Sequence, residues 1–260
     1  MIVGVTSDSR VNDYAATLIA QLASSGHAPA YVLYSRRQAQ AGWKTRFRRT
    51  VAGSSAAAWL RRARARTSVA TQSLQAHAEA NQLTGWDWPL TRVCHSHRME
   101  FCSIDHMNGS EAVDYVRHRQ TDLLINAGGG IFRPGIIQAP RTGILNAHMG
   151  LLPAFRGMNV LEWSLFHDQP PGVTVHLVDR GIDTGDTLAF EEITVEAGDT
   201  IASLRAKALV TSVELMVRAV EGLANSKLPR TEQHVEDGKQ YFSMHPRLKQ
   251  IVENKLALRR

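Results

Sequence analysis

The chain has 260 residues, of which 43% are hydrophobic and 21% are charged, and its formal net charge is +6. This composition is typical of a folded protein and excludes a disordered or collagen-like chain. No apolar run reaches the ~18 residues of a membrane-spanning helix, and the start MIVGVTSDSR lacks the basic region of a signal peptide. Two cysteines cannot build a disulfide framework, so one large α/β domain in the cytoplasm is expected.

Apolar periodicity predicts strands that alternate with helices along most of the chain. Strands are expected over residues 2–6, 30–34, 92–95, 122–126, 143–148, 173–178 and 187–195, and helices over 13–25, 69–81, 110–119, 160–166 and 200–223. Alternation of this kind favours a mostly parallel sheet whose ligands bind at the carboxyl ends of the strands.

Positive charge is concentrated in one segment, because residues 36–66 hold ten of the 30 Lys and Arg residues. Such a block attracts anions, so a nucleotide diphosphate, RNA and an anionic membrane surface are candidate partners. A pair of solvated helices with no specific ligand explains the charge equally well. Trp43, Phe47 and Trp59 interleave with the charges, as in an amphipathic helix that docks on its own domain.

Three polar residues lie where strands are expected to end. Asn146 and His148 are two positions apart, so a strand places both side chains on one face. Asp183 lies in a turn bounded by Gly181 and Gly185. An Asn can donate to an oxyanion, a His can transfer protons, and an Asp can orient the His. With no Ser or Cys beside them, these residues favour direct attack by a nucleophile of the substrate. On spacing alone, structural roles for them stay open.

The run NAHMGLLPAFRG that begins at Asn146, followed by GVTVH at Gly172 and GIDTG at Gly181, resembles the signature of the folate-dependent formyltransferases. This superfamily includes the glycinamide ribonucleotide, methionyl-tRNA and sugar N-formyltransferases. The resemblance covers roughly residues 120–222. It implies a Rossmann-like, mostly parallel sheet with flanking helices. We expect a catalytic domain over residues 1–225, with a basic helical insertion at 36–68 that the resemblance does not cover, and a short C-terminal extension over 226–260.

The same resemblance implies N10-formyltetrahydrofolate as co-substrate and assigns three catalytic residues. Asn146 would polarise the formyl carbonyl, His148 would stabilise the tetrahedral intermediate and move protons, and Asp183 would orient His148 and relay protons. The pterin would be held by a glycine-rich loop and by the turn before Asp183. The cofactor-binding residues expected on this basis are Gly128, Gly129, Gly130, Ile131, Phe132, Arg133, Asp179 and Gly181.

For the acceptor, the short tail resembles that of short formyltransferases, which implies a nucleotide-linked amino sugar of the kind used in surface polysaccharides such as the O-antigen of lipopolysaccharide. Residues 6–10 lack the glycine-rich phosphate loop of the glycinamide ribonucleotide enzymes, and the tail after residue 223 is too short for the added barrel of the methionyl-tRNA enzymes. The acceptor contacts expected are Arg10, Arg156, Met158, Asn159 and Trp163, and Arg36 and Arg37 are candidates, with Arg10, to neutralise a diphosphate. Tyr241 and Phe242 either stack on a base or form a core pair.

Other interpretations stay open at this point. A hydrolase of formyl-folate would share the fold, and an RNA- or membrane-associated protein would use the basic segment. Neither DNA nor a membrane span is expected, and the oligomeric state is open, a homodimer included. Cys94, His95, His97, Cys102 and His106 lie close in sequence, but their spacing fits no standard zinc pattern, so no metal is expected.

Overall fold

The computed structural model describes residues 1–36 and 68–259, and the chain divides into two units, residues 1–142 and 143–260. The basic helical insertion expected at 36–68 lies almost wholly outside the described residues, and so does Arg37. The boundary expected between residues 225 and 226 stays a prediction.

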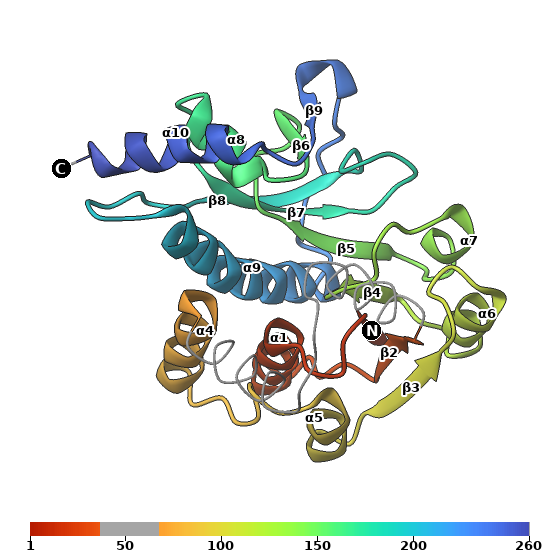
Figure 1. The fold of residues 1–260 in the computed structure, drawn as a ribbon. Helices are drawn as coiled ribbons and strands as arrows, with labels where there is room; N and C mark the ends of the chain where they lie inside the picture. The colour runs from red at the N-terminus through yellow and green to blue at the C-terminus, as the bar shows by residue number, and fades with distance from the viewer. Residues whose placement is uncertain (37–67, 260) are drawn as a thin grey trace, which may run out of the picture. The chain divides into compact units, whose positions relative to one another are not determined.

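Four strands of the first unit form a parallel sheet in the order β3-β2-β1-β4 (Figure 1). The strands are β1 (Val3–Ser7), β2 (Tyr31–Ser35), β3 (Glu100–Ile104) and β4 (Leu123–Asn126). Every residue of β1 and β2 is buried, including the polar Thr6, Ser7 and Ser35, so neither strand shows the alternation of a half-exposed strand. The edge strand β3 is only partly buried, and the apolar pattern does not predict it.

Two helices of the first unit, α1 and α4, begin at polar side-chain caps that the sequence supplies. The side chain of Asn12 accepts a hydrogen bond from the Ala15 amide at the start of α1, and Ser68 caps α4 in the same way. The helices are α1 (Asp13–Ser24), α4 (Val69–Ala80), α5 (Leu90–Ser96), α6 (Ser110–His118) and α7 (Pro134–Ile137).

Helix α5 overturns one expectation, because residues 92–95 are helical and do not form a strand. Its buried residues are Leu90, Val93 and Cys94, which recur at the three- and four-residue spacing of a helix face. The pair Val93–Cys94 alone fits a short strand. Only together with Leu90 does it show the spacing of a buried helix face.

The second unit contains an antiparallel sheet in the order β5-β7-β8. Its strands are β5 (Gly143–His148), β7 (Gly172–Leu177) and β8 (Thr187–Glu192). The long helix α9 (Ile201–Ala224) packs against all three strands, and Thr200 and Ser203 form a capping box at its start (Figure 1). Helix α8 (Val160–Phe166) has the bounds that its apolar spacing predicts.

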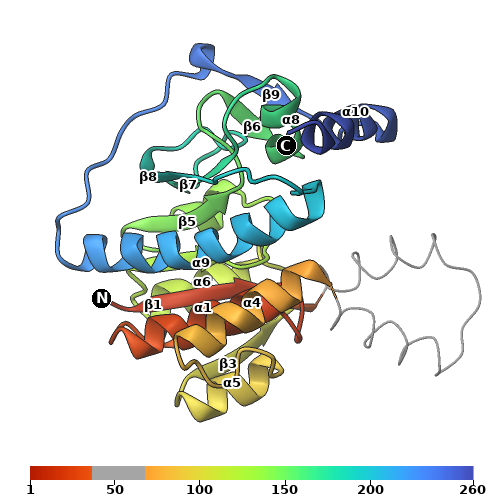
Figure 2. The ribbon, with the colours of Figure 1, turned by 90° about the vertical axis from the view of Figure 1, so that its left-hand side faces the viewer.

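The C-terminal part of the chain returns to the second unit's sheet. After α9 it passes along β8, where Thr231 and Thr187 exchange backbone hydrogen bonds, and Figure 2 shows this passage. The turn η1 (Val235–Asp237) and strand β9 (Lys239–Tyr241) follow, and β9 pairs in parallel with β6 (Phe155–Gly157). Helix α10 (Pro246–Ala257) then packs against α8.

The expected fold class is confirmed: the chain has a mostly parallel sheet with flanking helices. Parallel pairing joins β1 with β2 and β4, and β2 with β3, whereas β7 pairs antiparallel with β5 and β8. Over residues 1–36 and 68–259, no helix combines the length and apolarity that crossing a membrane requires.

Candidate active site

The register of β5 against β7 brings together the polar residues of the candidate site. Asn146 lies opposite His176, and His148 lies opposite Thr174. Because strand side chains alternate between faces, these residues share one face of the sheet, as the spacing of Asn146 and His148 predicts. The hydroxyl of Thr174 donates to the Gly150 carbonyl at 2.6 Å and also accepts from the backbone, so it is a structural group and not a nucleophile.

The orientation of the His148 ring is set by a backbone carbonyl. Its Nε2 lies 2.8 Å from the carbonyl oxygen of Phe155, which can only accept, so Nε2 carries a hydrogen. The other ring nitrogen, Nδ1, lies 3.4 Å from Oδ2 of Asp183. In the neutral ring Nδ1 therefore has a lone pair directed toward a carboxylate, and it is the atom that can take up a proton.

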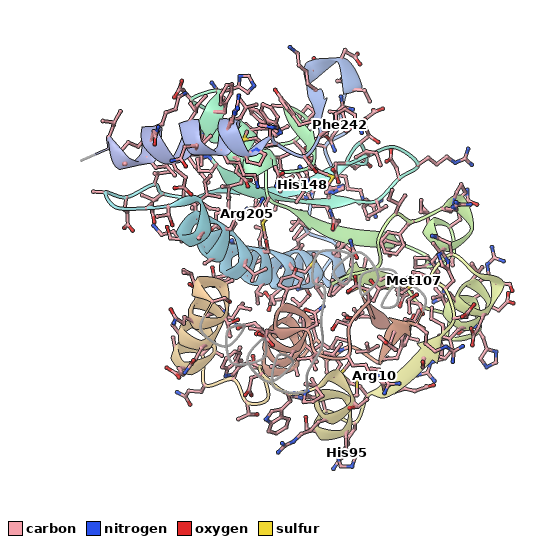
Figure 3. All side chains as sticks on the ribbon, viewed as in Figure 1. Arg10, His95, Met107, His148, Arg205 and Phe242 are labelled. Carbon is pink, nitrogen blue, oxygen red and sulfur yellow. The ribbon has the colours of Figure 1, made fainter. Side chains whose placement is uncertain are left out.

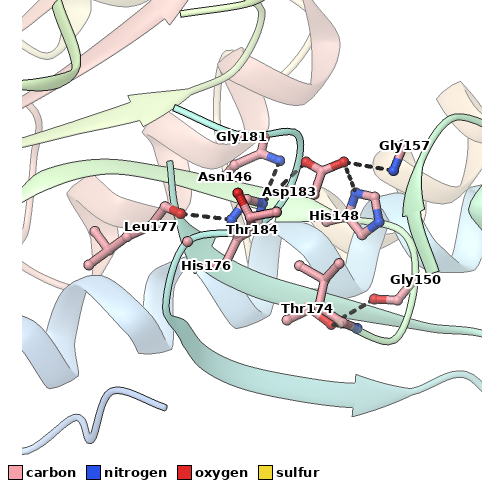
Figure 4. Close-up of polar contacts among 12 residues, drawn as sticks. Asn146, His148, Gly150, Gly157, Thr174, His176, Leu177, Gly181, Asp183 and Thr184 are labelled. Atoms are coloured by element: carbon pink, nitrogen blue, oxygen red, sulfur yellow. Dashed lines mark hydrogen bonds and ion pairs between the residues drawn. The ribbon is translucent and has the colours of Figure 1, made fainter. Parts of the chain in front are cut away.

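Asp183 is held in the turn after β7 with a left-handed backbone, at φ 54°. Its Oδ2 accepts a hydrogen bond from the Gly157 amide at 2.9 Å, and its Oδ1 lies 3.5 Å from Nε2 of His176. Figure 4 shows the carboxylate between these groups and His148. The side chain is 17% exposed, so the charge of Asp183 acts in a largely dehydrated setting.

The environment shifts the pKa of both titratable partners. Burial lowers the pKa of His148 below the ordinary histidine value, and the charge of Asp183 and the carbonyl of Phe155 only partly oppose it. Burial alone would raise the pKa of Asp183, but the hydrogen bond from His176, the charge of His148 and the Gly157 amide together hold it below its usual range. The pair therefore rests as neutral imidazole and carboxylate.

His176 is a fourth member of the site that the sequence reasoning did not assign. Its Nδ1 lies 2.8 Å from the Leu177 carbonyl and so carries a hydrogen, while its Nε2 lies 3.1 Å from the amide nitrogen of Asn146. Nε2 of His176 thus faces both the amide of Asn146 and the carboxylate of Asp183. Spacing along the sequence could not assign it, because its role depends on which residue lies opposite it in β5.

The glycine-rich loop predicted to hold the pterin belongs to the first unit. Gly128 has a φ of 125°, and Phe132 is buried against Gly129, whereas Ile131 is 73% exposed. The side chain of Asn108 clamps the loop, since it donates to the Ile131 carbonyl at 2.8 Å and accepts from the amide of Arg133 at 2.7 Å. Sequence reasoning did not assign Asn108. Binding of the cofactor by Gly128, Gly129, Gly130, Ile131, Phe132 and Arg133 stays a prediction.

In the turn before Asp183, the predicted residues Asp179 and Gly181 contact each other. Oδ1 of Asp179 accepts from the Gly181 amide at 3.0 Å and from the hydroxyl of Thr184 at 2.6 Å. These bonds fix the shape of an exposed turn. A contact between this turn and the pterin stays a prediction.

The residues predicted to face the acceptor differ in exposure. Arg156 is 7% exposed, and its guanidinium donates to the carbonyls of Val235 and Gly238 at 2.9 and 3.1 Å. Met158 is 58% exposed. Asn159 accepts from the Met244 amide at 3.0 Å, and the Trp163 indole donates to the Phe242 carbonyl at 2.9 Å. Arg156, Asn159 and Trp163 thus bind the C-terminal part of the chain.

The remaining predicted acceptor contact, Arg10, lies in the first unit, with its guanidinium over the ring of Tyr34. An acceptor contact stays a prediction for each.

The cysteine- and histidine-containing segment of the first unit covers helix α5, strand β3 and the residues just after it. Burial raises the pKa of the Cys94 thiol to about 11, and His95 points outward from α5 (Figure 3). No group of three or more His, Cys, Asp or Glu residues able to hold a metal ion occurs within the described parts of the chain.

Comparison with known families adds to this geometry. The family model described as "Formyl transferase" matches residues 22–220. The chain belongs to this family. Among curated relatives, the methionyl-tRNA formyltransferase of Methylacidiphilum infernorum is 28% identical over 148 residues, which cover 56% of this chain and 46% of that protein. That of Delftia acidovorans is 37% identical over 119 residues, covering 45% and 36%. The chain thus aligns with less than half the length of these two relatives.

Solved structures show the shared fold. Glycinamide ribonucleotide transformylase 1 from Symbiobacterium toebii has a TM-score of 0.60 and 18% identity, covering 90% of this chain and 95% of that one. An N-formyltransferase from Helicobacter canadensis, in complex with folinic acid and dTDP-3-aminofucose, has a TM-score of 0.57 and 12% identity, covering 93% and 71%. Over most of its length the chain therefore has the fold of these structures.

Proposed function

We propose that this chain transfers the formyl group of N10-formyltetrahydrofolate to a primary amine. The observation that carries the proposal is the arrangement of His148 and Asp183, in which a neutral imidazole has its proton-accepting Nδ1 3.4 Å from a carboxylate, on the same face as Asn146. Family membership supports the class of reaction. The geometry offers His148 as proton acceptor, Asp183 as the charge beside it and Asn146 as amide donor.

In the proposed reaction the amine nitrogen attacks the formyl carbon and forms a new carbon–nitrogen bond. The carbonyl π electrons move to oxygen, where the side-chain amide of Asn146 donates to the developing oxyanion. Nδ1 of His148 takes the proton that the amine loses, and Asp183 stabilises the resulting imidazolium. The oxyanion then re-forms the carbonyl as the bond from carbon to N10 breaks, and N10 receives the proton held at Nδ1 of His148. The N-formylated acceptor and tetrahydrofolate leave, the ring returns to its neutral form, and no covalent enzyme intermediate forms.

For the folate we propose the loop over residues 128–133 and, as a separate candidate, the turn before Asp183. The loop over residues 128–133 offers backbone groups and the exposed apolar side chain of Ile131, which suits a flat heterocycle with hydrogen-bonding edges. The turn at Asp179 and Gly181 offers further backbone groups close in sequence to Asp183. Both assignments predict that substitutions there raise the KM for formyl-folate more than they lower kcat.

For the acceptor we propose a nucleotide-linked amino sugar. Tyr241 stacks on Phe155 with ring centroids 5.3 Å apart, Trp163 packs beside it at 5.1 Å, and Phe242 is 70% exposed next to them. An aromatic surface of this kind suits a nucleobase. The Helicobacter canadensis structure with dTDP-3-aminofucose supports the class of acceptor. The curated relatives favour methionyl-tRNA instead, which makes it the second acceptor to test.

The test mixes the full chain and N10-formyltetrahydrofolate with a panel of nucleotide-linked amino sugars and with methionyl-tRNA, and follows tetrahydrofolate release and product mass. A product heavier than one amino sugar by one CO supports the proposal, and a formylated methionyl-tRNA redirects it to that acceptor. Release of tetrahydrofolate without any acceptor would show a hydrolase. No binding of formyl-folate would refute the function altogether.

A further inference from the structure

The C-terminal part of the chain contacts the Asp183 turn directly. The contact is made by Gln233, which precedes η1 and is 9% exposed. Its side-chain amide donates to the carbonyl of Asp183 at 3.3 Å and to the carbonyl of Gly185 at 2.5 Å. One side chain, fifty residues further along the chain, therefore holds both sides of the turn.

The orientation of this amide is fixed by chemistry. Both carbonyl oxygens can only accept, so the NH2 group of Gln233 must face them. Its Oε1 is then buried with no hydrogen-bond partner among the described residues. An unpaired buried acceptor costs about 1–3 kcal/mol. The two carbonyls of the turn thus fix the orientation of the Gln233 amide, although this orientation leaves Oε1 without a hydrogen bond.

Asp183 needs such support because of its backbone. A residue other than glycine at φ 54° is strained by about 1–3 kcal/mol and stays there only where its surroundings hold it. Gln233 holds the carbonyl of this residue. The side chain that leaves the same Cα lies against His148, so a change in the turn moves the carboxylate.

The carboxylate has a second anchor that depends on the same C-terminal part. The Gly157 amide donates to Asp183, and Gly157 is the last residue of β6. Strand β9 pairs with β6, and the Tyr241 carbonyl accepts from the amide of Met158 at 3.0 Å. Arg156 holds the chain between Gln233 and β9 by its bonds to two carbonyls there. Residues 231–241 therefore support Asp183 through its backbone and through its side chain.

We propose that Gln233 is a positioning residue, which acts through the Asp183 turn to keep the carboxylate against His148. The chemical consequence rests on the proposed function, whereas the positioning itself does not. Residues 231–241, which sequence reasoning placed in an extension beyond the catalytic domain, are on this proposal part of the catalytic machinery.

The test compares Gln233→Met, which keeps side-chain length but removes the donor, with Gln250→Met on the exposed face of α10 as a matched control. The first readout is the titration of the His148 ring by NMR in the full chain without substrate. The titratable groups that contact His148 in the described structure are Asp183 and His176, and neither is substituted. We expect the His148 midpoint to fall in Gln233→Met, because the carboxylate that favours the protonated ring moves away, and to stay unchanged in Gln250→Met.

The second readout is formyl transfer. We expect kcat to fall about 10- to 100-fold with KM nearly unchanged, since a misplacement on the scale of 1 Å costs about 10²-fold. If Gln233→Met is unfolded at the assay temperature, Gln233→Asn keeps the amide on a shorter side chain and is expected to shift both readouts in the same direction. A native His148 midpoint in a folded Gln233 variant overturns the proposal. The two proposals can also fail separately. If the native protein transfers no formyl group but the His148 midpoint shifts in Gln233→Met, the positioning role stands and the proposed function is refuted.

Discussion

Asp183→Asn isolates the contribution of one charge to the reaction. The substitution keeps the size of the side chain, and its oxygen can still accept from the Gly157 amide. At 3.4 Å from Nδ1 of His148, and with an effective dielectric constant of about 20, Coulomb's law gives roughly 5 kcal/mol for the ion pair. The Asn dipole recovers part of this, so about 4 kcal/mol is lost, which corresponds to about 10³-fold in rate.

The loss is expected in kcat and not in KM. His148 is neutral in the resting site, so the charge of Asp183 stabilises the ring only after the ring has taken up a proton. An Asn amide that donates to Nδ1 would also occupy the atom that accepts the proton. The assay measures tetrahydrofolate release at saturating co-substrate and acceptor, with Asp186→Asn, the same change three residues along, as control. A kcat for Asp183→Asn within tenfold of native would refute the assigned role of the charge.

Three further predictions concern the same unit. Because the pKa of His148 lies below the ordinary value of ~6.5, the ring is still neutral at that pH and can accept a proton. The value of kcat should therefore fall only at lower pH, with a slope of one in a plot of log kcat against pH. A fall centred above pH 7 would contradict the role of His148 as proton acceptor. Gly157→Ala forces a Cβ into the backbone of β9 at a φ of 98°, and should lower the free energy of unfolding in urea by about 1–3 kcal/mol together with kcat. Gly198→Ala, at a φ of 85° with open space around it, should lower stability less and leave kcat native. Arg205→Ala removes the bidentate partner of the fully buried Glu162 carboxylate, while Lys249 stays 3.2 Å from it. The free energy of unfolding in urea should therefore fall by about 3 kcal/mol, the lower end for a broken buried pair, with little effect on the KM for formyl-folate.

Much of the fold could be predicted from local pattern. The bounds of α8 follow from its apolar spacing, and the pairing of Asn146 and His148 on one face follows from the two-residue period of β5. The missed helix α10 also had a signal: Pro246 stands at its start, and its buried residues Val252 and Leu256 are one turn apart.

Other parts have no local signal. Strands β6 and β9 are three residues long, and each is defined by a partner far along the chain. The role of His176 depends on which residue lies opposite it in β5, and that of Gln233 depends on the path that the chain takes after α9. Such features are set by tertiary pairing, so spacing within a short window cannot reveal them.

The parallel pairing of β6 with β9 has a consequence for biosynthesis. Arg156 and the Gly238 carbonyl that it binds are 82 residues apart, so β6 leaves the ribosome well before its partner strand. Until then the Gly157 amide lacks the strand that fixes it beside Asp183. The four strands of the first unit have all been synthesised by residue 126, whereas the contact between His148 and Asp183 that we propose for proton transfer gains the support of β9 only after residue 241 has emerged. On the proposed mechanism, a nascent chain released before that point would carry Asn146, His148 and Asp183 without the strand that holds the carboxylate against His148.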